Sequence, residues 1–294
     1  MQQPESMNRM MMFPNKTKRM TALCLSIAAG SLVNGGFAAI PKPVPPLPAD
    51  AWRYADVADL FAAAPIVLRA KIVSATALKG VPTTNGAVRF YVEGDVTALI
   101  RGNQAVPPRL IWLVDMLPDS RGKIAKLKKA DVLIAALPVA GRPGEIRLAA
   151  RDAQVFWSLA IESRVRGIIA SVAAPDAPPA ITGIASAFHT AGTITGEGET
   201  QIFLSTVTGA PISMTVLTRP GQPKRWAFAL GEIVDEAAAP PVPDTLAWYR
   251  LACFLPRALP NTAIAELAVA DADAARADYS FVVQALGPCP RVRR

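Results

Sequence analysis

The sequence has very little histidine: His189 is the only one in 294 residues. A zinc site with two histidine ligands is therefore excluded, and a Ser-His-Asp or Cys-His catalytic site would have to use His189. The chain also lacks a Gly-Xaa-Ser-Xaa-Gly nucleophile elbow and a Gly-Lys-Ser/Thr phosphate loop. These absences remove the commonest signatures of hydrolases and nucleotide-binding enzymes, and we expect no cofactor and no metal.

Charged residues are also few, at 18%, whereas hydrophobic residues make up 51%. This composition argues against disorder and supports a sizeable core, and the length suggests about two domains. The net charge is +8. The densest basic runs of the chain lie at 123–129 and 291–294. They could attract nucleic acid or an anionic surface, but solvated turns or strand edges explain them more simply. We therefore expect no nucleic-acid partner.

The N-terminus has the layout of a secretory signal peptide. Three basic residues at positions 16–19 precede a run at 21–39 that carries no charge and ends in small residues. Cleavage after Ala38 would leave a periplasmic or secreted protein with no stable membrane span. The alternative is a retained anchor, because about 20 residues suffice to cross a bilayer.

Cysteine is scarce as well, with Cys24, Cys253 and Cys289 only. Export would remove Cys24 with the signal and place the other two in an oxidising compartment, where pairing is favoured. A bridge between them would close a loop of roughly 36 residues, worth about 3–4 kcal/mol in the loop-entropy model. The alternative is two buried free thiols.

After a proline-rich lead at 39–50, the first half of the chain is strand-like. A short helical period at 55–64 precedes five aliphatic, β-branched runs separated by glycine and proline: IVLRAKIVSATAL, VRFYVEGDVTALI, RLIWLVD, DVLIAAL and EIRLAA. Five short strands with no long helix among them predict a small antiparallel β-barrel at 51–152.

The order of these runs over residues 55–149 resembles the oligonucleotide-fold (OB-like) barrel of secreted netrin and tissue-inhibitor modules. The resemblance implies the barrel fold. Netrin-type modules usually carry cysteines in this stretch, and this sequence has none there, which argues against an inhibitor function. The chain is also similar to exported bacterial proteins of uncharacterised function, a resemblance that implies no activity.

The second half, 153–294, is predicted to be an α+β domain with a four-stranded antiparallel sheet and C-terminal helices. Apolar residues at helical spacing predict a helix at 155–172. Four strand candidates follow: ITGIASAFHTAGTIT, TQIFLSTV, PISMTVLTR and RWAFALGEIV. Helical patterns then cover 245–255, capped by Asp244, and 261–286, where the polar stretch ADADAARAD reads as a polar helix face.

The stretch GTITGEGETQIFL at 192–204 has two of the three glycines of a dinucleotide-binding loop. A strand pattern follows it rather than a helix, so no helix N-terminus would face a phosphate. We interpret it as a hairpin turn.

Candidate catalytic residues remain few: His189, Glu199 and Glu232, the carboxylates lying near the turn and after the last strand. The simpler interpretation makes His189 a hydrogen-bonded strand residue and the glutamates solvated. Aromatic side chains gather in the second half, where they predict core or, alternatively, a ligand groove: Trp226, Phe228, Trp248 and Tyr249. The sequence thus favours an exported cell-envelope binding protein for an unidentified envelope protein or polymer, with an envelope hydrolase as the alternative.

Overall fold

A computed structural model describes residues 52–102, 105–231 and 238–293. The expected signal segment, the proline-rich lead and Glu232 lie outside the described residues. The chain combines helices with antiparallel sheets and ends in helices, as the sequence predicted.

The first half begins with a short helix and continues as strands. Its elements, in chain order, are α1 (Tyr54–Phe61), β1 (Ile66–Ala77), β2 (Val88–Arg101), β3 (Arg109–Met116), β4 (Asp131–Pro138), β5 (Ile146–Leu148), β6 (Gln154–Phe156) and α2 (Leu159–Ala173). All five strands expected from the sequence are present as β1 to β5.

The six strands form one sheet in the order β3-β2-β1-β4-β5, with β6 paired to β4. Every ladder in it is antiparallel. Strands β3 and β5 approach one another at an isolated parallel bridge between Ile111 and Glu145, but the sheet is not closed into a barrel.

Strand β1 buries side chains on both of its faces because residues alternate between two hydrophobic cores. Leu68, Ala70 and Ile72 belong to the cluster enclosed by the curved sheet, together with Trp112 of β3. Val67 points the other way and packs in the cluster that contains α1 and α2. Arg69 and Lys71 interrupt the apolar run, so from Leu68 to Ile72 buried residues alternate with more exposed ones.

The second half contains the second sheet and the remaining helices. Its elements are β7 (Ile181–Ala191), β8 (Gly198–Thr206), β9 (Ile212–Thr218), β10 (Arg225–Ala229), α3 (Leu246–Ala252), the 3₁₀ helix η2 (Asn261–Ile264) and α4 (Val269–Leu286). The four strands pair antiparallel in the order β10-β9-β8-β7.

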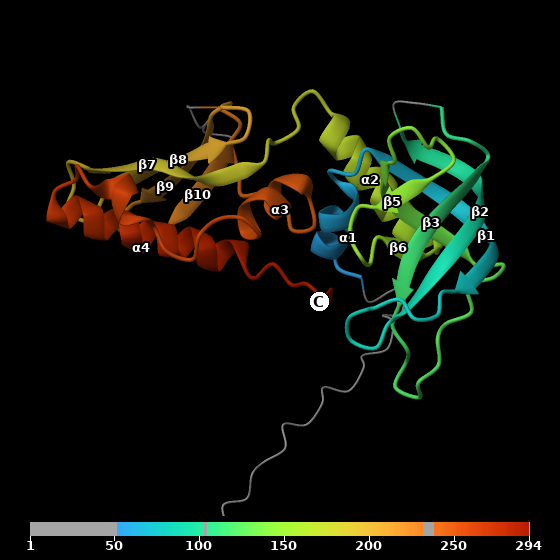
Figure 1. The fold of residues 1–294 in the computed structure, drawn as a ribbon. Helices are drawn as coiled ribbons and strands as arrows, with labels where there is room; N and C mark the ends of the chain where they lie inside the picture. Colours follow the sequence, from blue (N-terminus) through green and yellow to red (C-terminus); the bar gives the residue numbers. More distant parts are fainter. Residues whose placement is uncertain (1–51, 103–104, 232–237, 294) are drawn as a thin grey trace, which may run out of the picture. The chain divides into compact units, whose positions relative to one another are not determined.

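Helix α4 covers one face of this second sheet (Figure 1). The register places Ala187, Ile202, Met214 and Phe228 on one face, in line across the four strands. Three of these side chains are buried in the hydrophobic cluster that also contains α4, and Phe228 packs against it. The strands and the helix are therefore joined by apolar burial, the dominant favourable term in folding.

Two local predictions were wrong: the start of the helix expected at 155–172 and the cap of the helix expected at 245–255. Residues 154–156 form β6 instead of the start of a helix, and α2 begins only after Ser158, whose hydroxyl accepts from the Ile161 N–H. The cap of α3 is Thr245, not Asp244, since the Thr245 hydroxyl accepts from the Trp248 N–H. Pairing of β6 with β4 outweighed the helical spacing of this segment, a case of tertiary structure overriding local pattern.

The aromatic residues of the second half belong mainly to the core. Trp226, Trp248 and Tyr249 are buried and Phe228 is partly buried.

One hydrophobic cluster runs from α1 and α2 to α3, α4 and the second sheet. The domain boundary expected after residue 152 stays a prediction. None of the helices within the described ranges is both long and apolar enough to cross a membrane.

Candidate functional sites

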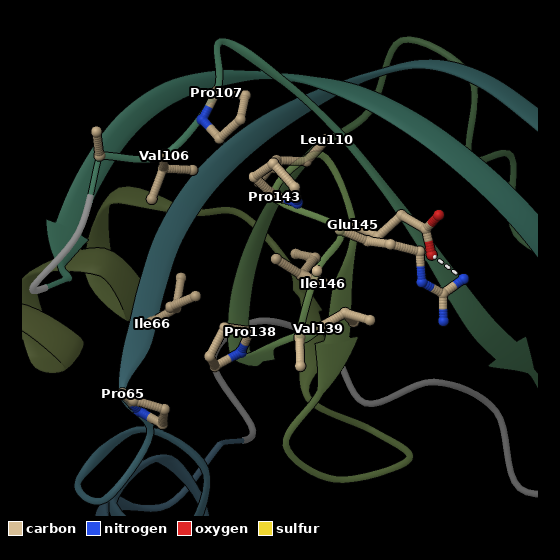
Figure 2. A pocket seen from close by; sticks show the side chains of 14 residues that line it. Pro65, Ile66, Val106, Pro107, Leu110, Pro138, Val139, Pro143, Glu145 and Ile146 are labelled. Atoms are coloured by element: carbon tan, nitrogen blue, oxygen red, sulfur yellow. Dashed lines mark ion pairs between the residues drawn. The ribbon is translucent and has the colours of Figure 1, made fainter.

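An apolar pocket of about 350 Å³ lies at one end of the first sheet (Figure 2). It is bordered by the start of β1, the segment before β3, and the end of β4 with the loop that follows. Its apolar lining is Pro65, Ile66, Ala105, Val106, Pro107, Leu110, Pro138, Val139, Ala140, Pro143 and Ile146. The size is in the range of small-molecule sites, which are typically about 300–1,000 Å³.

The floor and rim of the pocket have different origins. Leu110 and Ile146 are buried members of the core enclosed by the first sheet, so this core supplies part of the pocket lining. Prolines supply much of the rim, and their rings have a fixed backbone φ and no N–H that would need a partner. The result is an apolar surface that loses little entropy when a ligand binds.

The polar groups of the pocket are Arg142 and Glu145, whose side chains form an ion pair of 2.9 Å. Figure 2 shows this pair at one side of the apolar lining. Among the described residues that line the pocket, Glu145 is the single carboxylate, and histidine, serine, threonine and cysteine are missing. The lining thus fits binding of an apolar group, with one ion pair beside it.

The second candidate centres on His189 in β7. Its Nδ1 lies 2.9 Å from the Thr200 hydroxyl on β8, which in turn donates to the Asp278 carboxylate on α4. Lys224 donates to the other oxygen of Asp278 at 2.5 Å. Thr200 and Asp278 are 0% and 3% exposed, so this polar cluster lies between the sheet and α4.

The hydrogen bonds assign the protons of the cluster. The Thr200 hydroxyl gives its only proton to Asp278, so it accepts from Nδ1–H of His189. A neutral imidazole then keeps its lone pair on Nε2. Gly198 makes room for the ring, because a Cβ at that position would lie 2.8 Å from His189 Cε1.

The chain Asp278–Thr200–His189 has the residue order of a catalytic relay, but its hydroxyl is buried. The His189 side chain is 12% exposed, whereas the hydroxyl bonded to it among the described residues belongs to fully buried Thr200. A nucleophile must reach its substrate. Thr200 therefore fits a role in joining β7, β8 and α4 rather than one in covalent catalysis.

Of the two predicted carboxylates, Glu199 does not join this cluster, and Glu232 lies outside the described residues. Glu199 precedes Thr200 on β8 and so points to the opposite face of the sheet, where it accepts from the Gln201 amide at 2.8 Å. The turn at 192–197 connects the antiparallel strands β7 and β8, which confirms the hairpin interpretation of this segment.

Asp278 is the residue that sequence reasoning missed. It was assigned to a polar helix face, and the structure corrects this because Asp278 is buried. A signal was present: Ala275, Asp278 and Val282 follow at spacings of three and four, which puts the aspartate in the middle of the apolar stripe of α4. A carboxylate at such a position requires buried partners.

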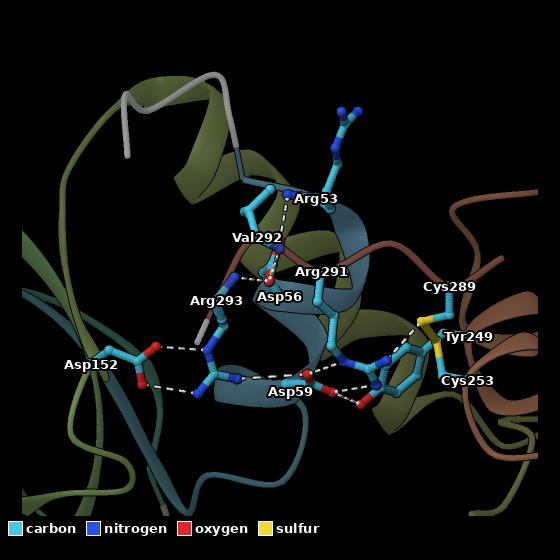
Figure 3. A network of polar contacts seen from close by, with 10 residues as sticks. All are labelled: Arg53, Asp56, Asp59, Asp152, Tyr249, Cys253, Cys289, Arg291, Val292 and Arg293. Atoms are coloured by element: carbon cyan, nitrogen blue, oxygen red, sulfur yellow. Dashed lines mark hydrogen bonds and ion pairs between the residues drawn. A yellow bond between two sulfur atoms is a disulfide. The ribbon is translucent and has the colours of Figure 1, made fainter. Parts of the chain in front are cut away.

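A second polar network surrounds the C-terminal segment, defined here as residues 287–293 (Figure 3). Cys253 and Cys289 lie at disulfide distance, with Cα atoms 5.2 Å apart and sulfurs 2.06 Å apart. Beyond them, Arg291 pairs with Asp59 of α1 at 2.7 Å, and Arg293 pairs with Asp152 at 2.7 Å. Arg291 and Arg293 are therefore paired with carboxylates. The interpretation of the 291–294 run as solvated charges was wrong for these two residues.

The carboxylates of α1 complete this network. Asp56, which is fully buried, accepts from the backbone N–H groups of Arg53, Val292 and Arg293. Burial tends to raise the pKa of Asp59, but hydrogen bonds from Arg291 and Tyr249 and the nearby arginine charges lower this pKa below its usual value. Asp59 is thus held in its charged form.

Within the residues that the structure describes, no group of three or more His, Cys, Asp or Glu side chains could hold a metal ion. Compared with models of known protein families and with curated proteins, the chain matches none.

Proposed function

We propose that the protein is an exported cell-envelope binding module whose ligand site is the apolar pocket at the end of the first sheet. The observation that carries the proposal is the pocket itself: about 350 Å³, lined mainly by prolines and aliphatic side chains, with one ion pair at its side. Such a lining suits a small ligand, or part of a larger one, that buries an apolar group. Export is proposed from the sequence alone.

We further propose that the first sheet has the strand arrangement of the OB-like barrel of netrin-type modules, open except at the bridge between β3 and Glu145. The strand order β3-β2-β1-β4-β5 supports this, and so does the parallel bridge at Ile111, whose N–H donates to the Gly144 carbonyl at 2.9 Å. A barrel of this type would join β3 to β5 at that bridge. Hydrogen exchange of the Ile111 amide tests the proposal: slow exchange is expected, and exchange as fast as in a loop contradicts it.

A fluorescence titration tests the pocket. The probe is 1-anilinonaphthalene-8-sulfonate, which combines an apolar ring system with an anion, and decanoate is the competitor. The proposal expects saturable binding that decanoate reverses. Val139→Asp places a charge in the lining and should weaken binding at least about tenfold, since burying an unpaired charge is costly.

Val207→Asp is the matched control, because Val207 is 66% exposed and lies outside the pocket lining. It should bind the probe as the unchanged protein does. The proposal is wrong if the unchanged protein shows no saturable binding, or if both variants lose binding equally.

Export is tested separately by intact-mass measurement of the protein recovered from its native cell. A mass that corresponds to loss of residues 1–38 in the envelope fraction supports the proposal. A cytoplasmic protein that still carries residues 20–38 contradicts it.

The alternative function is an envelope hydrolase, and the hydrogen-bonded chain from Asp278 through Thr200 to His189 is the observation that favours it. Among the carboxylates near the turn between β7 and β8, Glu199 accepts from Gln201 and has no described contact with His189. Turnover of ester, peptide or envelope polysaccharide substrates that His189→Ala abolishes would favour the hydrolase over the binding module.

A further inference from the structure

The Cys253–Cys289 pair has different surroundings at its two sulfurs, and the proposed binding function does not use it. Cys253 follows α3, and Cys289 lies in the C-terminal segment; both residues are partly exposed. The Nη1 group of Arg291 donates to the Cys289 sulfur at 3.1 Å. Among the described contacts, only Cys289 has a cationic hydrogen-bond donor.

The position of Arg291 is fixed from its other side. Its Nε donates to Asp59 Oδ2 at 2.7 Å and its Nη2 to Asp59 Oδ1 at 3.3 Å, which leaves Nη1 directed to the sulfur (Figure 3). The Asp59 carboxylate is held in turn by Tyr249 and Arg293. The donor at Cys289 is therefore positioned before any reaction occurs.

This asymmetry matters in thiol–disulfide exchange. The attacking thiolate bonds to one sulfur, and the other sulfur leaves with the electron pair of the broken bond. A guanidinium donor beside one sulfur stabilises the negative charge that develops there, as cationic neighbours stabilise thiolates in general. In this protein that stabilisation is available at Cys289.

We propose that Cys253–Cys289 is a thiol–disulfide exchange site at which an incoming thiolate bonds to Cys253 and Cys289 leaves as the thiolate beside Arg291. The S–S bond of the protein breaks as the new S–S bond forms. A second thiol of the reductant then attacks the mixed disulfide and frees Cys253. In total a dithiol, or two monothiols, is oxidised by two electrons, and its two protons pass to the protein thiols or to solvent.

Exchange at this site has a structural consequence for the C-terminal segment. The disulfide ties the segment to the end of α3, two residues before Arg291. After reduction, the segment is held to α1 and Asp152 by polar contacts of Arg291, Val292 and Arg293, part of which are exposed. These contacts lack a covalent tie, so the segment should open more often after reduction than in the oxidised protein.

The direction of attack is tested on the full chain with reduced glutathione. The reaction is stopped early with excess iodoacetamide, and peptide mass mapping locates the two modifications. We expect glutathione on Cys253 and the alkyl group on Cys289 in at least about tenfold excess over the reverse pattern, which corresponds to a preference of about 1.4 kcal/mol.

Arg291→Gln should bring this ratio close to one, and Arg291→Lys, which keeps the charge but not the fork of donors, should give an intermediate ratio. Arg276→Gln is the matched control, because Arg276 pairs with Asp273 on α4 and has no contact with the cysteines. The proposal is overturned if glutathione is found mainly on Cys289, if Arg291→Gln leaves the ratio unchanged, or if the folded protein does not exchange at all. The ratio compares two products formed in the same sample, so more frequent opening of the C-terminal segment raises both products together.

Discussion

Two buried aspartates, one on α1 and one on α4, satisfy their carboxylates in different ways. Asp56 is 0% exposed and accepts from three backbone N–H groups. Asp278 is 3% exposed and accepts from two side chains, the Thr200 hydroxyl and the Lys224 ammonium. The first carboxylate is bound by main chain, which every substitution except proline retains, and the second by groups that single substitutions remove.

The difference separates two kinds of helix attachment. Asp56 joins the start of α1 to the C-terminal segment through the backbone, so the identity of the facing side chains matters little. Asp278 joins α4 to Thr200 of β8 and to Lys224, which precedes β10. This attachment therefore depends on specific side chains in three separate segments. A buried charge is costly in either setting unless it is paired and hydrogen-bonded.

The largest effect is expected for Asp278→Ala. It leaves the buried Thr200 hydroxyl and the partly buried Lys224 without their partner, and we expect a loss of about 3 kcal/mol in the free energy of unfolding. Urea denaturation at pH 7 measures it. Asp273→Ala on the same helix is the control: that carboxylate is 68% exposed, and its removal should cost below about 0.5 kcal/mol.

Asp56→Ala should cost less, about 2 kcal/mol, because it leaves backbone N–H groups without an acceptor but no buried countercharge. The same urea experiment gives the value. The comparison between the two aspartates would fail if Asp56→Ala proved more destabilising than Asp278→Ala. Faster proteolysis of the C-terminal segment should accompany the loss.

Changing the partners instead of the aspartates sharpens the comparison. Lys224→Met removes a donor of Asp278 and should cost about 1.5 kcal/mol, because a charged hydrogen bond is lost. Val292→Ala keeps the backbone N–H that Asp56 uses, so it should cost below about 1 kcal/mol. Thermal or urea unfolding of the two variants provides the measurement, and equal losses would contradict the distinction.

The smallest effect concerns Asp59, the more exposed neighbour of Asp56 on α1. Its pKa is lowered in the folded state, so its contribution is present above its unfolded pKa of about 3.9 and is lost as pH falls through the lower folded value. Asp59→Asn should therefore lower Tm at pH 6 by a few degrees or less. The difference from the unchanged protein should shrink below about pH 4, and a constant difference down to pH 2.5 would exclude this linkage.

Much of the fold could be predicted from the sequence. Strand runs such as IVLRAKIVSATAL have the aliphatic, β-branched character of strands, and they appear as strands in the structure. The hairpin at 192–197 was likewise readable from its glycines and from the strand that follows. In these segments the local pattern and the tertiary environment favour the same conformation.

The candidate sites were much less predictable. The pocket is lined by residues from three separate stretches of the chain, which include Pro65, Pro107 and Ile146, and no spacing in the sequence brings them together. Asp278 had a readable sign in its place on an apolar helix stripe, but its partners lie 54 and 78 residues away. His189 was singled out for its rarity, and neither its neighbour Thr200 nor the room left by Gly198 followed from that.

The sequence by itself determined the strands, the helical C-terminus and the two cysteines able to pair, because periodicity and composition act over neighbouring residues. Only the tertiary structure decided that residues 154–156 pair with β4, that Arg291 bridges Asp59 and Cys289, and that Asp278 is buried. Those outcomes depend on which distant segments share a hydrophobic core. Once burial removes water from a polar group, the group must bond to whatever the fold has placed beside it.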